Sequence, residues 1–417
     1  MRLHETTVEP DVGRERHHAD PSGWGPRLDG SWIGRGDRGI AGSGIMLTMV
    51  AEPPARPRPS SGRFDPGRLE RAFEVVAQAV GSGEPPAAVL AVAGADGPIL
   101  ARGFGSDGSG GRIGVAHRFR VASVTKPIVA TAVMQLVEEG RVTLSDPIRR
   151  VVPEFAPPPV AEGRAGSEAV TVWHVLTHTS GATDLDWVGQ GQAPPSAEAL
   201  IASVCSRPLS FVPGATYTYA SDTFYLLGLL LQRVGGHPTI GAALRARILE
   251  PLGMAATGFE MEVEGYPNAP VSIVGSDGLD VERYSRWISA IEHPGGGLWS
   301  TAHDLVAFGR ASMGSPAVPP ILGGALLELM RREQTAGILE PGDPPRRATY
   351  GLGWGKSTLS GRMPGPPSVV DHAGATGSRL WVDPSNGLVV ALLVGRWGAE
   401  RTLADAAIAA VYGALEG

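Results

Sequence analysis

The chain has 417 residues, enough for about two domains, and its 42% hydrophobic and 19% charged residues exclude disorder of the whole chain. A net charge of −6 provides no basic surface for nucleic acid, and apolar runs such as Phe224–Leu231 are far shorter than the roughly 18 residues of a membrane span. The single cysteine, Cys205, excludes an internal disulfide. Of 36 basic residues only two, Lys126 and Lys356, are lysines.

Residues 1–63 differ in composition from the rest of the chain. They are rich in Gly, Pro and Arg, include the run PPARPRP, and show no helical or strand period. Such a segment buries too little apolar surface to offset the entropy of ordering, so we predict a disordered extension. It also lacks the apolar core of a signal peptide, and we therefore expect a cytoplasmic protein without a membrane span.

The first predicted elements after residue 63 are a helix and a hairpin. Leu69, Phe73, Val76 and Val80 recur three and four residues apart from residue 65 on, and glycines at 81 and 83 end this pattern. Short β-type runs then flank the turn sequence GADG, which is typical of a hairpin. The runs cover 87–93 and 98–103.

The remaining elements place strands near both ends of the chain and helices between them. We expect helices over 123–139, 223–234 and 402–415, and strands over 369–372, 378–382 and 388–394. This order predicts an α/β sheet domain made from both termini, which holds an inserted, mainly α-helical domain. We place the sheet part at about 64–122 and 345–417, and the helical part at about 123–344.

Several motifs suggest a cofactor or a metal but lack the context that such a site needs. GRGDRG at 34–39 and GFGSDG at 103–108 both fit G-x-G-x-x-G, yet neither connects a strand to a helix, so we predict no dinucleotide site. His174 and His178 have the spacing of metal ligands on a helix, but no third ligand is near, and we expect structural roles and no metal. No serine stands in G-x-S-x-G, which argues against a nucleophile elbow.

The informative segment is FRVASVTKPIVATAVMQLVEE over 119–139, in which Ser123 and Lys126 form S-x-x-K. Residues three apart share one helix face, so the hydroxyl and the amine can approach each other. A serine becomes a good nucleophile when a base removes its proton, and lysine can be that base if its pKa falls from about 10.4, whereas arginine cannot. Because lysine is rare in this chain, its presence at position 126 favours a catalytic role. The alternative is that Ser123 caps the helix and Lys126 is a solvated first-turn residue.

Two further segments add candidate residues. Tyr219, in PGATYTYASDTFYLLG, precedes an apolar helix, and a phenol beside an ammonium ionises more easily and can carry a proton to a leaving group. DHAGATGSRLWVDP over 371–384 reads as a strand interrupted by Gly374 and Gly377, and such glycines often mark close approach by a ligand or another backbone. Core packing of the tyrosine and a bulge at the glycines are the alternatives.

The order S-x-x-K, then Tyr-x-Ser, then a His-x-Gly strand resembles the serine β-lactamase and penicillin-binding-protein superfamily. The closest likeness is to its class C-like branch, which includes family VIII carboxylesterases. The segments VTVWHVLTHTSGATD and HPGGGLWSTAHDLVAFG also occur in the expected order, and the resemblance covers about residues 65–417. It implies a β-lactamase/transpeptidase-like fold, in which N- and C-terminal helices flank an antiparallel sheet and a mainly α-helical domain is inserted.

The resemblance also implies roles for single residues. Ser123 matches the acylated nucleophile, Lys126 its proton partner and Tyr219 the general base. The oxyanion hole would consist of the backbone N–H groups of Ser123 and about Ala375. The substrate-binding positions that it implies are Ser221, His372, Gly374 and Ala375.

Two of these positions depart from the β-lactamases. Ser221 stands where that branch has asparagine, and His372 replaces the lysine of Lys-Thr-Gly, which meets the β-lactam carboxylate. A histidine with a pKa of about 6.5 is mostly neutral at about pH 7.5, and Arg379 is the nearest other positive charge in sequence. We therefore expect esters to be preferred over β-lactams, with β-lactam acylation gaining as the pH falls through the titration of His372.

The combined prediction is a cofactor-free serine hydrolase that forms a covalent acyl-enzyme, a carboxylesterase whose partner is a small or medium acyl ester. The alternatives are an acyltransferase of natural-product assembly, a β-lactamase or D-aminopeptidase, and a non-catalytic ligand-binding relative. Four aromatic residues are either pocket walls or packing residues. They are Trp187, Tyr217, Trp299 and Trp381.

Overall fold

A five-stranded antiparallel sheet joins the two ends of the folded chain. Its strand order is β2-β1-β9-β8-β7, so β1 (Ala87–Gly94) pairs with β9 (Leu388–Val394) from the other end of the sequence. Ala91 lies opposite Ala391 at the centre of this pair. The remaining strands are β2 (Ile99–Gly105), β7 (Val370–Ala373) and β8 (Arg379–Asp383).

The structure is a computed structural model, which describes residues 64–416 except for 98, 109, 159–165, 167–168, 186–193, 264–270, 272, 274, 276–279 and 400. The predicted extension over 1–63, with its GRGDRG motif, lies outside the described residues, as does Trp187. Among the described residues, no helix combines the length and the apolarity that a membrane crossing requires.

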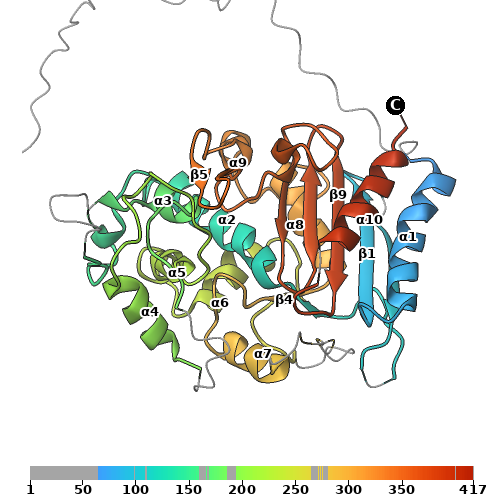
Figure 1. The fold of residues 1–417 in the computed structure, drawn as a ribbon, viewed down its shortest axis with the longest axis horizontal. Helices are drawn as coiled ribbons and strands as arrows, with labels where there is room; N and C mark the ends of the chain where they lie inside the picture. The colour runs from blue at the N-terminus through green and yellow to red at the C-terminus, as the bar shows by residue number, and fades with distance from the viewer. Residues whose placement is uncertain are drawn as a thin grey trace, which may run out of the picture. The chain divides into compact units, whose positions relative to one another are not determined.

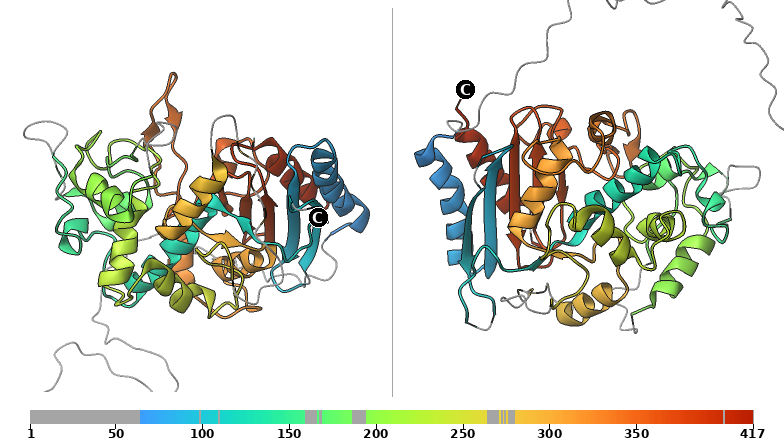
Figure 2. Two further views of the ribbon diagram at one scale, coloured as in Figure 1. Left: turned by 90° about the horizontal axis from the view of Figure 1, so that it is seen from below. Right: turned by 180° about the vertical axis from the view of Figure 1, so that it is seen from behind.

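Helices cover both faces of the sheet. On one face, α1 (Pro66–Gly81) and α10 (Thr402–Gly413) lie side by side although they come from opposite ends of the domain (Figure 1). On the other face, α8 (Ala302–Met313) packs against β1, β8 and β9 (Figure 2). Because both faces are covered, every residue of β1 and β9 is buried, and these strands read as continuous apolar runs.

Alternate residues of β1 belong to two separate hydrophobic clusters, as the period of a strand requires. Ala88, Leu90 and Val92 pack with α1 and α10, whereas Val89 and Ala91 pack with α8 and the helical region. Edge strand β2 alternates between exposed and partly buried residues instead. The sheet therefore separates a small core under the terminal helices from the larger core that surrounds the site.

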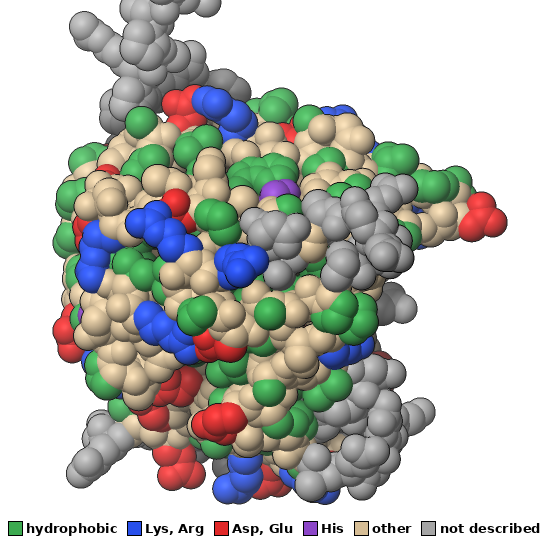
Figure 3. Space-filling view, turned by 90° about the vertical axis from the view of Figure 1, so that its left-hand side faces the viewer, with side chains coloured by type: hydrophobic (Ala, Val, Ile, Leu, Met, Phe, Trp, Pro, Cys, Tyr) green, Lys and Arg blue, Asp and Glu red, His purple; other side chains and the backbone are tan. Residues whose placement is uncertain are grey.

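The helical region follows β2 and holds most of the remaining elements. Its helices are α2 (Thr125–Glu138), α3 (Val172–Leu176), α4 (Ala197–Ser206), α5 (Phe224–Arg233), α6 (Ile240–Leu244), α7 (Val281–Ala290) and α9 (Gly324–Arg331). Two short antiparallel strand pairs lie outside the five-stranded sheet: β3 (Phe119–Arg120) with β4 (Trp299–Ser300), and β5 (Leu339–Glu340) with β6 (Arg346–Arg347). On the face drawn in Figure 3, acidic and basic side chains lie interspersed.

The structure confirms the predicted fold class, an antiparallel sheet flanked by the N- and C-terminal helices with helices inserted between its strands. The predicted start of the second helix was wrong by two residues, because Ala122–Val124 form a tighter 3₁₀ turn and α2 begins at Thr125. The two-residue strand pairs were not predicted, since they are too short to show a period.

Gly353 tests how tightly the loop before the last three strands packs on α2. Its φ is +73°, and a Cβ there would lie 2.3 Å from the Cβ of Ala130, whereas Gly361 has a φ of +72° and no atom near the place of its Cβ. Gly361→Ala should cost about 1–2 kcal/mol through backbone strain alone, and Gly353→Ala about 1–3 kcal/mol more through overpacking. Urea unfolding measures both, and equal losses would contradict the close packing.

Candidate active site

The backbone before Ser123 is held in an unusual conformation. Ala122 has a φ of +46°, in the left-handed region that is costly for a residue with a Cβ. Val121 N–H donates to Leu298 O at 3.0 Å, and Thr125 Oγ1 donates to Ala122 O at 2.7 Å, so both sides of the turn are fixed. Ser123 therefore lies in a rigid turn between β3 and α2 and not within the helix.

Ser123 lines a cavity of about 480 Å³ between the helical region and strand β7. Of the seven predicted site residues, five line this cavity. They are Ser123, Tyr219, His372, Gly374 and Ala375. The other two, Lys126 and Ser221, contact Ser123 or each other from behind. The fold thus brings all seven together from segments that are far apart in the sequence.

Lys126 is fully buried and makes three hydrogen bonds, all to neutral acceptors. Its Nζ lies 3.3 Å from Ser123 Oγ, 3.0 Å from Ser221 Oγ and 2.6 Å from Gly295 O. Burial lowers the pKa of Lys126 from 10.5 to about 7, against the opposing charges of Asp184 and Asp222. The alternative of a solvated first-turn lysine is therefore wrong. Ser123 does not cap the helix either, since α2 has no side-chain cap.

Tyr219 packs directly over the Lys126 amine. Nζ lies 4.6 Å from the ring centroid, a cation–π distance whenever the amine is protonated. The residue is 38% exposed because it lines the open cavity. Burial of its hydroxyl raises the pKa of Tyr219, and the hydroxyls of Ser123 and Ser221 oppose this only in part. The expectation that the phenol ionises more easily was wrong, because desolvation outweighs the two serine hydrogen bonds and the charge of Arg401.

His372 is held neutral by its surroundings. Its Nε2 lies 2.9 Å from Tyr350 Oη, and its Nδ1 lies 3.1 Å from Ala373 O. Burial and the nearby Lys126 lower the pKa of His372 well below 6.5. The expected gain of charge near pH 6.5 was therefore wrong, since the imidazole stays neutral through that range.

The predicted close approach at Gly374 is confirmed. A Cβ there would lie 2.3 Å from Val121 O, so the backbone directly after strand β7 touches the backbone that leads into the Ser123 turn. Gly374 N–H donates to Ser378 O at 2.7 Å, which leaves Ala375, the next residue, to face the cavity beside Ser123. Only a glycine permits this contact.

Two further basic side chains beside the cavity, Arg379 and Lys356, are held by polar groups of the protein. Arg379 Nη2 lies 2.7 Å from Asp371 Oδ2, and both side chains are buried. Lys356 is buried and donates to the backbone carbonyls of Pro367 and Val369, and burial lowers its pKa to about 8. Arg401, at the start of α10, is exposed and lines the rim of the cavity.

The aromatic residues proposed as pocket walls divide between two roles. Tyr217 lines the cavity, whereas Trp299 and Trp381 are buried and act as packing. Sequence reasoning missed Tyr350, which lines the cavity and holds His372. Nothing in its sequence context distinguishes it from an ordinary core tyrosine.

The paired histidines make separate contacts within the protein. His174 Nδ1 contacts Thr171, whereas His178 Nδ1 accepts from Ala220 N–H at 3.2 Å. His178 O also accepts from Thr218 N–H at 3.0 Å. The imidazole ring packs on the ring of Tyr219, with 4.4 Å between the ring centroids. One histidine therefore holds the backbone on both sides of Tyr219 and supports its ring.

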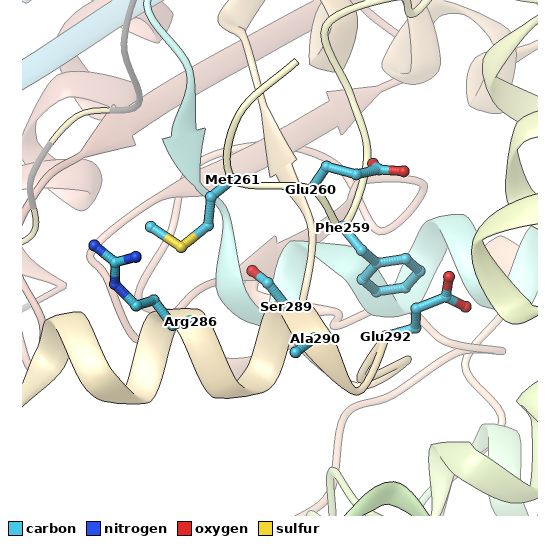
Figure 4. A pocket seen from close by; sticks show the side chains of 7 residues that line it. All are labelled: Phe259, Glu260, Met261, Arg286, Ser289, Ala290 and Glu292. Atoms are coloured by element: carbon cyan, nitrogen blue, oxygen red, sulfur yellow. The ribbon is translucent and has the colours of Figure 1, made fainter. Parts of the chain in front are cut away.

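A second hollow, of about 390 Å³, lies beside α7 (Figure 4). Its charged side chains are bound within the protein: Arg286 to Glu282, Glu260 to Arg245, and Glu292 to Gly241 N–H. The charged groups that line this hollow are therefore engaged by other parts of the protein.

Comparison with known proteins gives consistent matches. The profile of the family described as Beta-lactamase matches residues 73–413. Esterase EstB of Burkholderia gladioli is 32% identical over 315 residues, which cover 66% of this chain and 76% of that protein. Penicillin-binding protein 4 of Amycolatopsis lactamdurans is 30% identical over 318 residues, 74% of this chain and 80% of that protein.

Among solved structures, EstCE1, described as a hydrolase with promiscuous acyltransferase activity, superimposes with a TM-score of 0.68. The match is 20% identical and covers 83% of this chain and 99% of that chain. At this identity the likeness concerns the fold, and it agrees with the β-lactamase/transpeptidase-like architecture expected from the sequence.

The contacts of His178 predict a graded loss of stability on substitution. His178 has a φ of +58°, which asparagine tolerates better than alanine, and an asparagine Oδ1 can take the place of Nδ1 as acceptor for Ala220 N–H. His178→Ala should lose about 3–5 kcal/mol through the cavity and the orphaned N–H, and His178→Asn at least about 1 kcal/mol less. Urea unfolding measures the difference, and equal losses would show that the acceptor is unimportant.

Proposed function

We propose that this chain, which belongs to the β-lactamase family, is a carboxylesterase that cleaves small or medium acyl esters through an acyl group carried on Ser123. The match to the family and to Esterase EstB supports a serine hydrolase. The observation that carries the proposal is the buried Lys126 amine 3.3 Å from Ser123 Oγ, with its pKa lowered to about 7. At neutral pH a large share of this amine is uncharged and can accept the serine proton.

In the proposed acylation, Ser123 Oγ attacks the ester carbonyl while its proton passes to the neutral Lys126 amine. Tyr219, a neutral phenol with a raised pKa, donates its proton to the departing alkoxide and is reprotonated by the Lys126 ammonium beneath its ring. The products are an alcohol and the acyl-serine. In deacylation, water supplies the proton to Lys126 as it attacks, and Ser123 Oγ regains a proton when the acid leaves.

The oxyanion of each tetrahedral intermediate would lie between the backbone N–H groups of Ser123 and Ala375. Both residues line the cavity, and the contact of Gly374 with Val121 O sets the distance between their segments. Ser221, on the other side of Lys126, would hold the amine in place as its acceptor.

The charges on and beside strand β7 favour a neutral ester over a β-lactam. His372 stays neutral, and Arg379 is paired with Asp371, so strand β7 offers no unpaired ammonium of the kind that meets a β-lactam carboxylate. A neutral ester needs no such partner. The same acyl-serine could pass its acyl group to an alcohol or amine, so acyl transfer is the second candidate function.

A substrate panel tests these assignments. A p-nitrophenyl ester should be hydrolysed with a kcat/KM at least about tenfold above that of nitrocefin. This ratio should not change as the pH falls through 6.5, because burial lowers the pKa of His372 well below that value. Intact-mass analysis after phosphonate treatment should show one adduct, absent from Ser123→Ala. Nitrocefin turnover equal to ester turnover, or an adduct on Ser123→Ala, would contradict the proposal. Added amines that outcompete water would favour acyl transfer.

The lowered pKa of Lys126 predicts the pH dependence. The group must be neutral to accept a proton, so ester kcat/KM should rise through about pH 7 and level off above it. Lys126→Arg keeps the charge but cannot become neutral, and should retain less than about a tenth of wild-type kcat/KM, a loss of about 1.4 kcal/mol or more. Lys356→Arg is the matched control. In this variant the rise of ester kcat/KM with pH should occur at the same pH as in the wild type. An active Lys126→Arg variant would show that charge alone suffices.

A further inference from the structure

A second polar cluster lies behind Lys126, on the side away from the main cavity. The shortest hydrogen bond of Nζ, at 2.6 Å, goes to the backbone carbonyl of Gly295 in the segment HPGGG. A hollow of about 150 Å³ adjoins this carbonyl. Its polar lining consists of Asp184, Ser221, Asp222, Tyr284, His293 and the glycines 295 and 296.

His293 fixes the direction of the Gly295 carbonyl. Gly295 N–H donates to His293 Nδ1 at 3.0 Å, and Gly296 N–H donates to His293 O at 3.2 Å. The peptide planes on both sides of Gly295 are therefore tied to one residue. Because the second plane carries the Gly295 carbonyl, any movement of His293 moves the acceptor of Lys126.

Asp222 in turn fixes His293. Since Nδ1 accepts from a backbone N–H, the ring proton of the neutral imidazole resides on Nε2, which lies 2.9 Å from Asp222 Oδ1. Asp222 Oδ2 accepts from Leu185 N–H at 2.8 Å, and both Asp222 and His293 are buried. The carboxylate thus sets both the tautomer and the orientation of the imidazole.

We propose that Asp222 and His293 are positioning residues, which hold the Gly295 carbonyl against Nζ of Lys126 and so keep the amine within reach of Ser123. This inference rests on the proposed function, since it assigns a supporting role for the same reaction. Neither residue touches the main cavity, and the chain Asp222–His293–Gly295–Lys126 reaches Ser123 from the opposite side.

Asp222 also acts on Lys126 through its charge. The titratable groups that face Lys126 from the surrounding elements are Asp184, Asp222, His178, Tyr219 and His372. The two carboxylates raise the pKa of Lys126, whereas burial lowers it more strongly. Removal of the Asp222 charge should therefore lower the pKa of Lys126 further and move the acid limb of the reaction to lower pH.

The test uses the full chain and two readouts: the rate of Ser123 phosphonylation by intact mass, and p-nitrophenyl ester kinetics, each against pH. His293→Ala should lower kcat about tenfold or more while KM changes less than about twofold. His293→Gln, whose amide can donate to Asp222 and accept from Gly295 N–H, should restore much of that loss. Asp222→Asn should lower the plateau and shift the acid limb down by about half a pH unit or more.

Asp304→Asn is the matched control. This partly buried carboxylate accepts from Thr257 Oγ1 at 2.7 Å and has no contact with Lys126, so its loss should leave the acid limb in place. Unchanged rates in folded His293→Ala, or an unmoved acid limb in Asp222→Asn, overturn the inference. If His293→Ala does not fold, the inference is judged by the reaction rates of His293→Gln and by the acid limb of Asp222→Asn. A wild-type chain that takes no phosphonate label and cleaves no ester overturns the proposed function, and this inference with it.

Discussion

Burial of one amine without a bound carboxylate is the constraint on which the site depends. Lys126 is fully buried, and its three hydrogen-bond partners are two serine hydroxyls and one backbone carbonyl. A shift of its pKa from 10.5 to about 7 corresponds to on the order of 5 kcal/mol against the ammonium form. Neutral acceptors tolerate either protonation state, whereas a direct ion pair would hold the proton permanently. The surroundings of Lys126 thus keep it poised between the two forms.

The use of lysine and arginine across the chain follows the same reasoning. Both lysines, Lys126 and Lys356, are buried and have lowered pKa values, while the rest of the 36 Lys and Arg residues are arginines. A guanidinium remains charged at any accessible pH and suits ion pairs such as that of Arg379 with Asp371. The charges of Asp184 and Asp222 raise the pKa of Lys126 without a direct contact, but by less than burial lowers it.

Rigid backbone contacts assemble the site from four distant segments. The sheet made from both termini brings strand β7 against the turn before Ser123, with contact at Gly374. His178 holds the backbone around Tyr219, and His293 holds the Gly295 carbonyl behind Lys126. Ser123, Lys126 and Tyr219 are therefore each supported by a histidine or a glycine contact, so their placement depends on backbone hydrogen bonds and close packing.

The sequence by itself determined the fold class, the main helices and strands, and the candidate pair Ser123 and Lys126, because helical period, strand runs and S-x-x-K spacing are local properties. The order of its motifs, through the resemblance that it carries, added Tyr219. It could not determine the environment of these groups. The raised pKa of Tyr219, the neutral state of His372 and the parts played by Tyr350, His178 and His293 were decided by the tertiary structure. Desolvation and hydrogen-bond partners come from segments as far as about 170 residues away in the chain, as for Lys126 and Gly295. The spacing of residues within one segment cannot reveal these long-range contacts.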